Sequence, residues 1–163
     1  PGVFKAMAGV FGIDVETLDL DSNLKPNCVG SVSQMPFEDD AYDVVCGFQM
    51  LEHLPFDQSL IAFREMSRVA RVGIVLSLPN SATRWPCSIS LPKGRAMQFS
   101  IPKPQLRARA HRFDGQHYWE INKRGFALDS VKNELLNAAP VELTKTFRVP
   151  ELPYHHFFVF TKG

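Results

Sequence analysis

Two carboxylates directly after a predicted strand could bind the hydroxyl groups of a ribose. Residues 13–19 alternate apolar and polar side chains and end at Asp19, and Asp21 follows two residues later. This alternation predicts a β-strand. Ligands of open α/β sheets bind beyond the carboxyl ends of the strands. A carboxylate there can accept hydrogen bonds from both ribose hydroxyls, each contributing about 1.5–3 kcal/mol. The same position also suits a turn residue or a helix cap.

Histidines beside carboxylates are the second group of candidates. Glu52 and His53 follow the apolar run 42–48, but they form no H-E-x-x-H motif, which excludes a zinc protease of that type. His117 and Glu120 lie just past a basic segment. A histidine with a carboxylate can transfer protons. We therefore take His53, His117 and Glu120 as candidate catalytic residues; an aromatic cluster that only anchors the chain is the structural alternative.

Several other chemistries lack their motifs. The sequence has neither a G-x-S-x-G nucleophile elbow nor a G-x-x-x-x-G-K-[ST] phosphate loop. Its three cysteines form no C-x-x-C pair, so we expect no metal site and predict reduced, buried thiols in a cytoplasmic protein. With 163 residues, 18 Lys and Arg against 17 Asp and Glu, and no apolar run near ~20 residues, the chain predicts one globular domain without a membrane span.

The elements expected around these residues alternate between helix and strand. Apolar runs at 42–48 and 72–78 are typical of parallel strands that are buried on both faces. Asp57 is placed to cap the helix after the first run. The order predicts a mostly parallel α/β sheet with an antiparallel C-terminal edge. The expected helices are 3–11, 58–70 and 127–138; the expected strands are 13–19, 26–30, 42–48, 72–78, 141–149 and 155–161.

Residues 81–116 interrupt this alternation. The segment holds several prolines and shows little periodicity, and it is too long for an ordinary connection. We interpret it as a basic insertion or a substrate lid within the single domain 1–163. Its basic side chains could meet an anionic substrate, RNA phosphates or an acidic lipid, or simply be solvated. They are Arg84, Lys93, Arg95, Lys103, Arg107, Arg109 and Arg112.

Four motifs in order resemble the small class I S-adenosylmethionine-dependent methyltransferases grouped as type 11. The stretch 30–45 is similar to their "G-D-x-x-x-L-P-F-x-D-x-x-F-D-x-V" segment. The sequence M-L-E-H-L at 50–54 is similar to "V-L-E-H-L", and E-M-S-R-V at 65–69 to "E-x-x-R-V". The likeness covers about residues 1–80 and implies a Rossmann-like sheet, the cofactor S-adenosyl-L-methionine and transfer of its methyl group to an unidentified acceptor.

The resemblance also assigns expected roles to cofactor-binding residues. Asp19 would hold the ribose, Leu20 would pack beside the adenine, and Ser31 with Val32 would meet the adenine edge. The family usually has Asp at position 31, so the Ser hydroxyl predicts adenine selection weaker by about 1 kcal/mol. The remaining expected residues line the methionine part of the cofactor or lead into the first helix: Phe48, Gln49 and Gly2.

The chain departs from the family at its front. The family's first central strand and glycine-rich loop have no counterpart before Pro1-Gly2. In the family that strand lies between the ones expected here at 13–19 and 42–48. Losing several ladder hydrogen bonds at about 1–3 kcal/mol each would rival the stability of a whole domain. We therefore expect an N-terminally truncated fragment, and whether the fragment itself is active stays open.

Other functions stay open at this stage. A non-catalytic methyltransferase-like scaffold or partner subunit is the main alternative, favoured by the missing loop and Ser31. A nicotinamide-dependent enzyme would also use an acidic residue after its second strand. A nucleic-acid-binding module would need strongly salt-dependent affinity. The expected partner is a small or anionic acceptor molecule.

Overall fold

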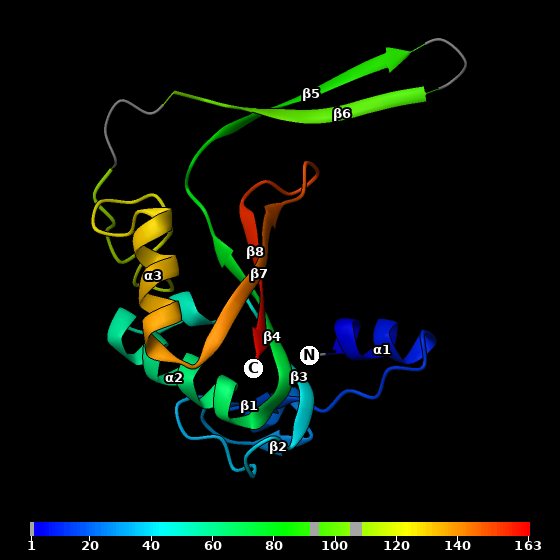
Figure 1. The fold of residues 1–163 in the computed structure, drawn as a ribbon, viewed down its shortest axis with the longest axis vertical. Helices are drawn as coiled ribbons and strands as arrows, with labels where there is room; N and C mark the ends of the chain where they lie inside the picture. The colour runs from blue at the N-terminus through cyan, green and yellow to red at the C-terminus, as the bar shows by residue number, and fades with distance from the viewer. Residues whose placement is uncertain (1, 92–94, 105–108) are drawn as a thin grey trace.

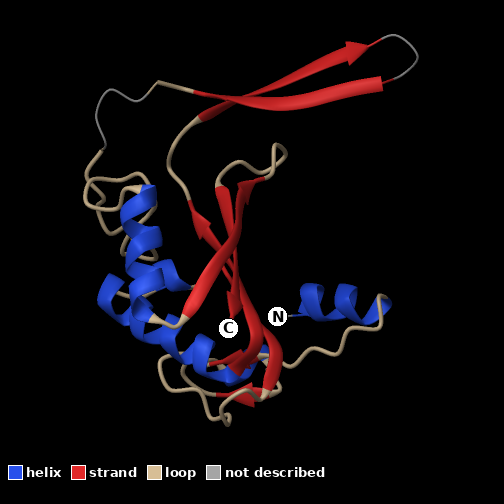
Figure 2. Cartoon of the chain, viewed as in Figure 1, coloured by secondary structure: helices blue, strands red, loops and turns tan. Residues whose placement is uncertain are grey.

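The computed structural model describes residues 2–91, 95–104 and 109–163, which form a mixed sheet with helices on both of its sides (Figures 1 and 2). The helices are α1 (Gly2–Val10), α2 (Phe56–Val69) and α3 (Leu128–Ala138), with short 3₁₀ turns η1 (Ser22–Leu24) and η2 (Leu51–His53). The strands are β1 (Leu18–Asp19), β2 (Cys28–Val29), β3 (Tyr42–Phe48), β4 (Ala70–Pro79), β5 (Arg84–Leu91), β6 (Arg95–Pro102), β7 (Val141–Arg148) and β8 (His155–Lys162).

The main sheet has the strand order β3-β4-β8-β7. β3 and β4 run parallel, and β8 runs antiparallel to both β4 and β7. β1 and β2 form a separate parallel pair. The predicted α/β class and the antiparallel C-terminal edge are therefore confirmed. No described strand lies between β1 and β3. This is the place where the sequence predicts that the family's first central strand is missing.

The core lies between β4, β8 and the two helices α2 and α3, which cover the same side of the sheet (Figure 1). Phe63 and Met66 of α2 are fully buried, as are Ile74 on β4 and Phe160 on β8. Gly73 lets β4 and β8 approach closely, because a Cβ at this position would lie 2.3 Å from the Phe160 carbonyl oxygen. β4 is thus the central strand that its apolar run predicts.

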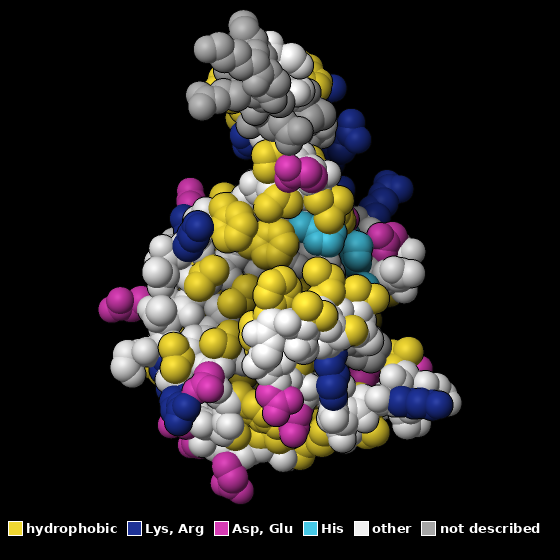
Figure 3. Space-filling view, turned by 90° about the vertical axis from the view of Figure 1, so that its right-hand side faces the viewer, with side chains coloured by type: hydrophobic (Ala, Val, Ile, Leu, Met, Phe, Trp, Pro, Cys, Tyr) yellow, Lys and Arg dark blue, Asp and Glu magenta, His cyan; other side chains and the backbone are white. Residues whose placement is uncertain are grey.

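β3 differs from its prediction, because it is an edge strand rather than one buried on both faces. Its outer edge pairs with nothing in the described part of the chain, and Val44, Cys46 and Phe48 are exposed. Figure 3 shows hydrophobic side chains gathered on the face that lies toward α1 in Figure 1. Phe4 of α1 contacts Phe48 edge-on at 5.1 Å between ring centroids. An apolar run shows that a strand is suited to burial. Whether the strand is buried depends on which strands or helices lie next to it.

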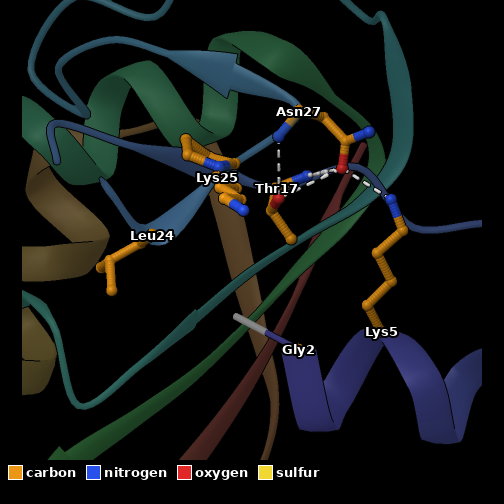
Figure 4. Close-up of a pocket in the computed structure, with 7 residues that line it drawn as sticks. Gly2, Lys5, Thr17, Leu24, Lys25 and Asn27 are labelled. Carbon is orange, nitrogen blue, oxygen red and sulfur yellow. Dashed lines mark hydrogen bonds between the residues drawn. The ribbon is translucent and has the colours of Figure 1, made fainter. Parts of the chain in front are cut away.

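α1 is held to the β1–β2 pair by hydrogen bonds that converge on one amide oxygen (Figure 4). Asn27 Oδ1 accepts from Lys5 Nζ at 2.6 Å and from Thr17 Oγ1 at 3.1 Å. These residues line a hollow of about 180 Å³, which Gly2 also borders. Gly12 ends the helical region with φ of 71°, as predicted.

Residues 84–102, read from the sequence as aperiodic, form the antiparallel hairpin β5–β6. The hairpin stands away from the main sheet in Figure 1. Prolines are tolerated here because both strands of a hairpin are edge strands. Trp85 pairs with Ile101, and Ile89 with Met97, so one face of the hairpin is apolar. The expected basic residues Lys93 and Arg107 lie outside the described residues.

Three smaller predictions need correction. The strand expected over 13–19 shortens to β1, because its first five residues form no ladder. Helix α2 begins earlier than expected, so that Pro55 is its N-cap and Asp57 lies in its first turn. The cysteines are free but not buried, and Cys46 is exposed on the edge strand. Among the described residues, no helix is both long and apolar enough to cross a membrane.

Candidate functional site

Four of the expected cofactor residues lie where the parallel pair β1–β2 ends. Asp19 is the last residue of β1 and is half-buried, and its Oδ1 accepts a hydrogen bond from Asp21 N at 2.9 Å. Leu20 is 71% exposed, so its side chain is free to pack on a flat ligand. Ser31 follows β2, and its Oγ accepts from Ser33 N at 3.2 Å. Val32 packs partly against the core, which fixes the backbone of this turn.

The remaining expected cofactor residues come from β3 and α1. Gln49 has a positive φ of 49°, so the chain turns sharply after β3. Its backbone N–H donates to Ser77 O at 2.9 Å and its Nε2 donates to Ser77 Oγ at 3.3 Å. Phe48 is 38% exposed beside α1. Gly2 begins α1 at the hollow shown in Figure 4.

The three candidate catalytic residues meet at the carboxyl ends of β3 and β4. His53 ends the turn η2 that follows β3. The segment 114–121 is attached at the end of β4, because Ile121 N donates to Pro79 O at 3.0 Å. This segment carries His117 and Glu120 to the same place, and the rings of His53 and His117 lie 5.1 Å apart between centroids. The fold therefore brings together His53, His117 and Glu120, which are far apart in the sequence.

Carboxylates surround His117 within this cluster. Its Nδ1 lies 3.7 Å from Glu120 Oε1 and 3.7 Å from Asp114 Oδ2. His111 Nδ1 lies 4.0 Å from the same Glu120 oxygen. Asp114 also accepts backbone hydrogen bonds from residues 116 and 117, which lower the pKa of its carboxyl. Carboxylate oxygens of Asp114 and Glu120 therefore make the surroundings of His117 negative.

Glu52 is the most unusual group in the cluster. It is 0% exposed, and both of its carboxylate oxygens are buried without a hydrogen-bond partner. Burial raises the pKa of Glu52 to about 7. Tyr154 lies near the same carboxylates, and burial raises the pKa of its hydroxyl to about 12, with smaller effects from Glu120 and Glu52. The sequence signals this burial only through the flanking residues Leu51 and Leu54.

A polar network below the cluster was missed by the sequence analysis. Asn80 Nδ2 donates to His156 Nδ1 at 2.8 Å, and His156 Nε2 lies 2.7 Å from Thr146 Oγ1. Because Nδ1 accepts, Nε2 carries the proton and donates to the threonine. Asn80 Oδ1 also accepts from Asn122 Nδ2 at 2.9 Å. This network joins β4, β7 and β8 to the turn at 122 that follows the cluster.

Comparison with known proteins now adds a family to this geometry. Residues 3–78 match the sequence family described as "Methyltransferase domain". No curated protein matches the chain.

Solved structures give the fold over almost the whole chain. The PH0226 protein of Pyrococcus horikoshii is 13% identical, with 99% of this chain and 79% of that chain covered at a TM-score of 0.62. An S-adenosylmethionine-dependent methyltransferase of Mesorhizobium loti is 13% identical, with 99% and 86% covered at 0.61. The 1,6-didemethyltoxoflavin-N1-methyltransferase of Burkholderia thailandensis, solved with S-adenosylhomocysteine, is 15% identical, with 99% and 66% covered at 0.60.

The fold is that of class I S-adenosylmethionine-dependent methyltransferases, as the sequence resemblance implies. The residues at the end of β1 are of the types that S-adenosylmethionine would require, because the half-buried carboxylate of Asp19 adjoins the exposed apolar side chain of Leu20.

Proposed function

We propose that this protein transfers a methyl group from S-adenosylmethionine to a small-molecule acceptor at the carboxyl ends of β3 and β4. The observation that carries the proposal is the convergence of His53, His117 and Glu120 at the carboxyl ends of β3 and β4. S-adenosylmethionine supplies, when bound, a methyl group on a sulfonium that leaves as a neutral thioether. Proximity and orientation supply most of the catalysis in such a displacement.

The chain's own residues divide this work between two regions. Asp19 binds the ribose hydroxyls, Leu20 covers the adenine, and Ser31 accepts from its amino group. Phe48 and Gln49 line the methionine part. Support for this division comes from their positions at the ends of β1, β2 and β3.

The histidine cluster serves the acceptor. When the cofactor is bound, an oxygen or nitrogen of the acceptor would take its methyl group and release a proton to the pair formed by His117 and Glu120, whose Nδ1 and Oε1 atoms lie 3.7 Å apart. The exposed rings of Phe113 and Tyr118 lie 4.6 Å apart between centroids at an interplanar angle of 41°, and Tyr118 directly follows His117, which favours an acceptor with a planar ring.

The open edge of β3 is part of the same proposal. A further extended segment would pair with this edge and complete the cofactor site; the exposed Val44 and Cys46 support this. Hydrogen exchange of the β3 amides tests it by comparing the 163-residue chain alone with the same chain carrying an added extended segment before Gly2. We expect added protection of these amides in the extended chain, and equal exchange in both would contradict the idea.

The cofactor itself is tested by thermal unfolding of the complete gene product. A ligand present at 100 times its Kd stabilises by about 2.7 kcal/mol, which raises Tm by several degrees. We expect this shift with S-adenosylhomocysteine and none with NAD. A shift with NAD alone would instead support a nicotinamide enzyme.

A non-catalytic scaffold is the second candidate, favoured by one observation. Ser31 stands where the family usually has an aspartate, and its Oγ already accepts from Ser33 N. The absence of any shift with S-adenosylhomocysteine in the complete product would support this reading and contradict catalysis.

A further inference from the structure

We propose that Glu52, His53 and His117 bind a divalent transition-metal ion of the zinc type, which holds the acceptor. The binding part of this proposal stands alone, whereas the link to the acceptor rests on the proposed methyltransferase function. The sequence predicts no metal site, because it contains neither a C-x-x-C pair nor H-E-x-x-H spacing. The three ligands proposed here come from two segments that only the fold brings together.

The first argument is the unpaired carboxylate of Glu52. Both of its oxygens are buried without a partner in a side chain that is 0% exposed. An ionised carboxylate that is removed from water without a counter-charge costs several kcal/mol or more. Such a group is relieved by taking up a proton or by binding a cation. The backbone holds Glu52 in place, since Tyr118 N donates to Glu52 O at 2.8 Å.

The second argument is the geometry of the ligand atoms. One ligand atom each from Glu52, His53 and His117 lies within 4.8 Å of the other two. Zinc binds nitrogen and carboxylate oxygen at about 2.0–2.2 Å, so its ligands stand about 3–4 Å from one another. Small side-chain rotations therefore bring the three atoms onto one ion. Two histidines with one carboxylate and an open position are the ligand set of many catalytic metal sites.

The third argument is the set of groups behind the ligands. His53 Nδ1 lies 3.1 Å from the Gln116 carbonyl oxygen, which can only accept, so this nitrogen carries the proton. Nε2 of His53 then keeps its lone pair for a metal, which is the usual way that a backbone carbonyl orients a ligating histidine. His111 Nε2 likewise lies 2.8 Å from His117 O and fixes that segment.

A second possible ligand set shares His117 but is less suitable. Asp114, His117 and Glu120 also lie within ligand distance of one another. Asp114 Oδ1, however, already accepts two backbone hydrogen bonds, and Glu120 Oε2 lies 3.9 Å from Lys123 Nζ. These two carboxylates are better placed to make the surroundings of the ion negative. Of these three carboxylates, only that of Glu52 has buried oxygens without a hydrogen-bond partner.

The ion would give the site a defined task. His53 is exposed, so the open coordination position can be reached from solvent. A bound ion would hold an oxygen or nitrogen of the acceptor and lower the pKa of a bound hydroxyl. With the ion in place His53 and His117 would be its ligands, which leaves Glu120 of the His117–Glu120 pair to take the acceptor proton.

The test is a titration of the chelator-treated, complete gene product with Co²⁺ and Zn²⁺ in the absence of cofactor. We expect each chain to bind one Co²⁺ ion. Its visible absorption bands should be those of Co²⁺ with a low coordination number, and they should disappear when Zn²⁺ displaces the Co²⁺. Glu52→Gln keeps the shape but removes the charge, and removing a ligand should weaken binding by about 100-fold or more. His53→Ala should do the same at an exposed position, where folding is not at risk. Glu142→Gln and His155→Ala are the matched controls and should bind as the wild type does.

Two outcomes would overturn the proposal. One is the absence of saturable one-to-one binding at millimolar metal. The other is binding that survives both Glu52→Gln and His53→Ala, which would place the ion elsewhere. The titration contains no cofactor. A failure to bind metal is therefore independent of the Tm shift with S-adenosylhomocysteine, which tests the proposed function.

Discussion

His156 makes the stability of the fold depend on pH below neutrality. The ring is buried between Asn80 and Thr146, and burial lowers its pKa to about 4, with smaller effects from Arg148, Lys132 and Arg84. Because the folded pKa lies below the unfolded value of 6.5, the unfolded chain binds more protons between these limits. The stabilisation that His156 contributes to the fold is fully present above pH 6.5 and is lost as the pH falls toward 4.

The size of this loss follows from the difference between the two pKa values. A difference of about 2.5 units at 1.36 kcal/mol per unit gives about 3 kcal/mol. That is a large part of the 5–15 kcal/mol that stabilises a typical domain. Charging the ring also breaks the hydrogen bond from Asn80 Nδ2, since Nδ1 can then no longer accept.

Urea unfolding at several pH values between 4 and 8 measures the effect. His156→Gln removes the titrating ring, so the stability difference between wild type and variant should shrink by about 3 kcal/mol from pH 7 to pH 4. His155→Gln on the same strand is the control and should leave the pH dependence unchanged. A difference between wild type and His156→Gln that stays constant over this range would refute the reasoning.

Two further predictions concern packing. Gly73→Ala forces a Cβ against the Phe160 carbonyl oxygen and should destabilise the fold by about 3 kcal/mol in urea unfolding. Gly9→Ala in α1 is the control, because its Cβ meets open space, and it should stabilise the fold by about 0.5–1 kcal/mol. Equal effects of the two substitutions would contradict the close approach of β4 and β8. Trp119→Phe loses the hydrogen bond from Nε1 to Ser59 Oγ and some buried volume, so it should cost about 2 kcal/mol. A loss below about 0.5 kcal/mol by the same assay would show that this bond contributes little.

The helices and strands around the core follow from local periodicity, and sequence reasoning finds them. β4 is a continuous apolar run because both of its faces are covered, and α2 shows a stripe with Phe63 and Met66 because one face packs on that strand. Burial of β3 could not be predicted, because its run looks the same whether or not a neighbour covers it. Hairpin β5–β6 was missed since its prolines outweighed the alternation of Trp85, Cys87 and Ile89.

The candidate site was predictable in its parts but not in its assembly. Asp19 stands out locally as a carboxylate that ends a strand. His53 and His117 meet only because segment 114–121 attaches at the end of β4, and no local pattern reports a contact across 64 positions. Apart from its apolar neighbours Leu51 and Leu54, the sequence does not indicate that Glu52 is buried, because glutamate is usually exposed.

The most direct test of the central claim is calorimetric binding of S-adenosylhomocysteine to the complete gene product. Hydrogen bonds from ribose hydroxyls to Asp19 contribute about 1.5–3 kcal/mol each, so Asp19→Asn should weaken one-to-one binding at least tenfold. Asp21→Asn is the control. Asp21 caps η1 by accepting from Asn23 N, and asparagine caps equally well, so the affinity of this variant should stay within about twofold of wild type. No binding by the wild type, or equal affinity of Asp19→Asn, would contradict the cofactor site described here.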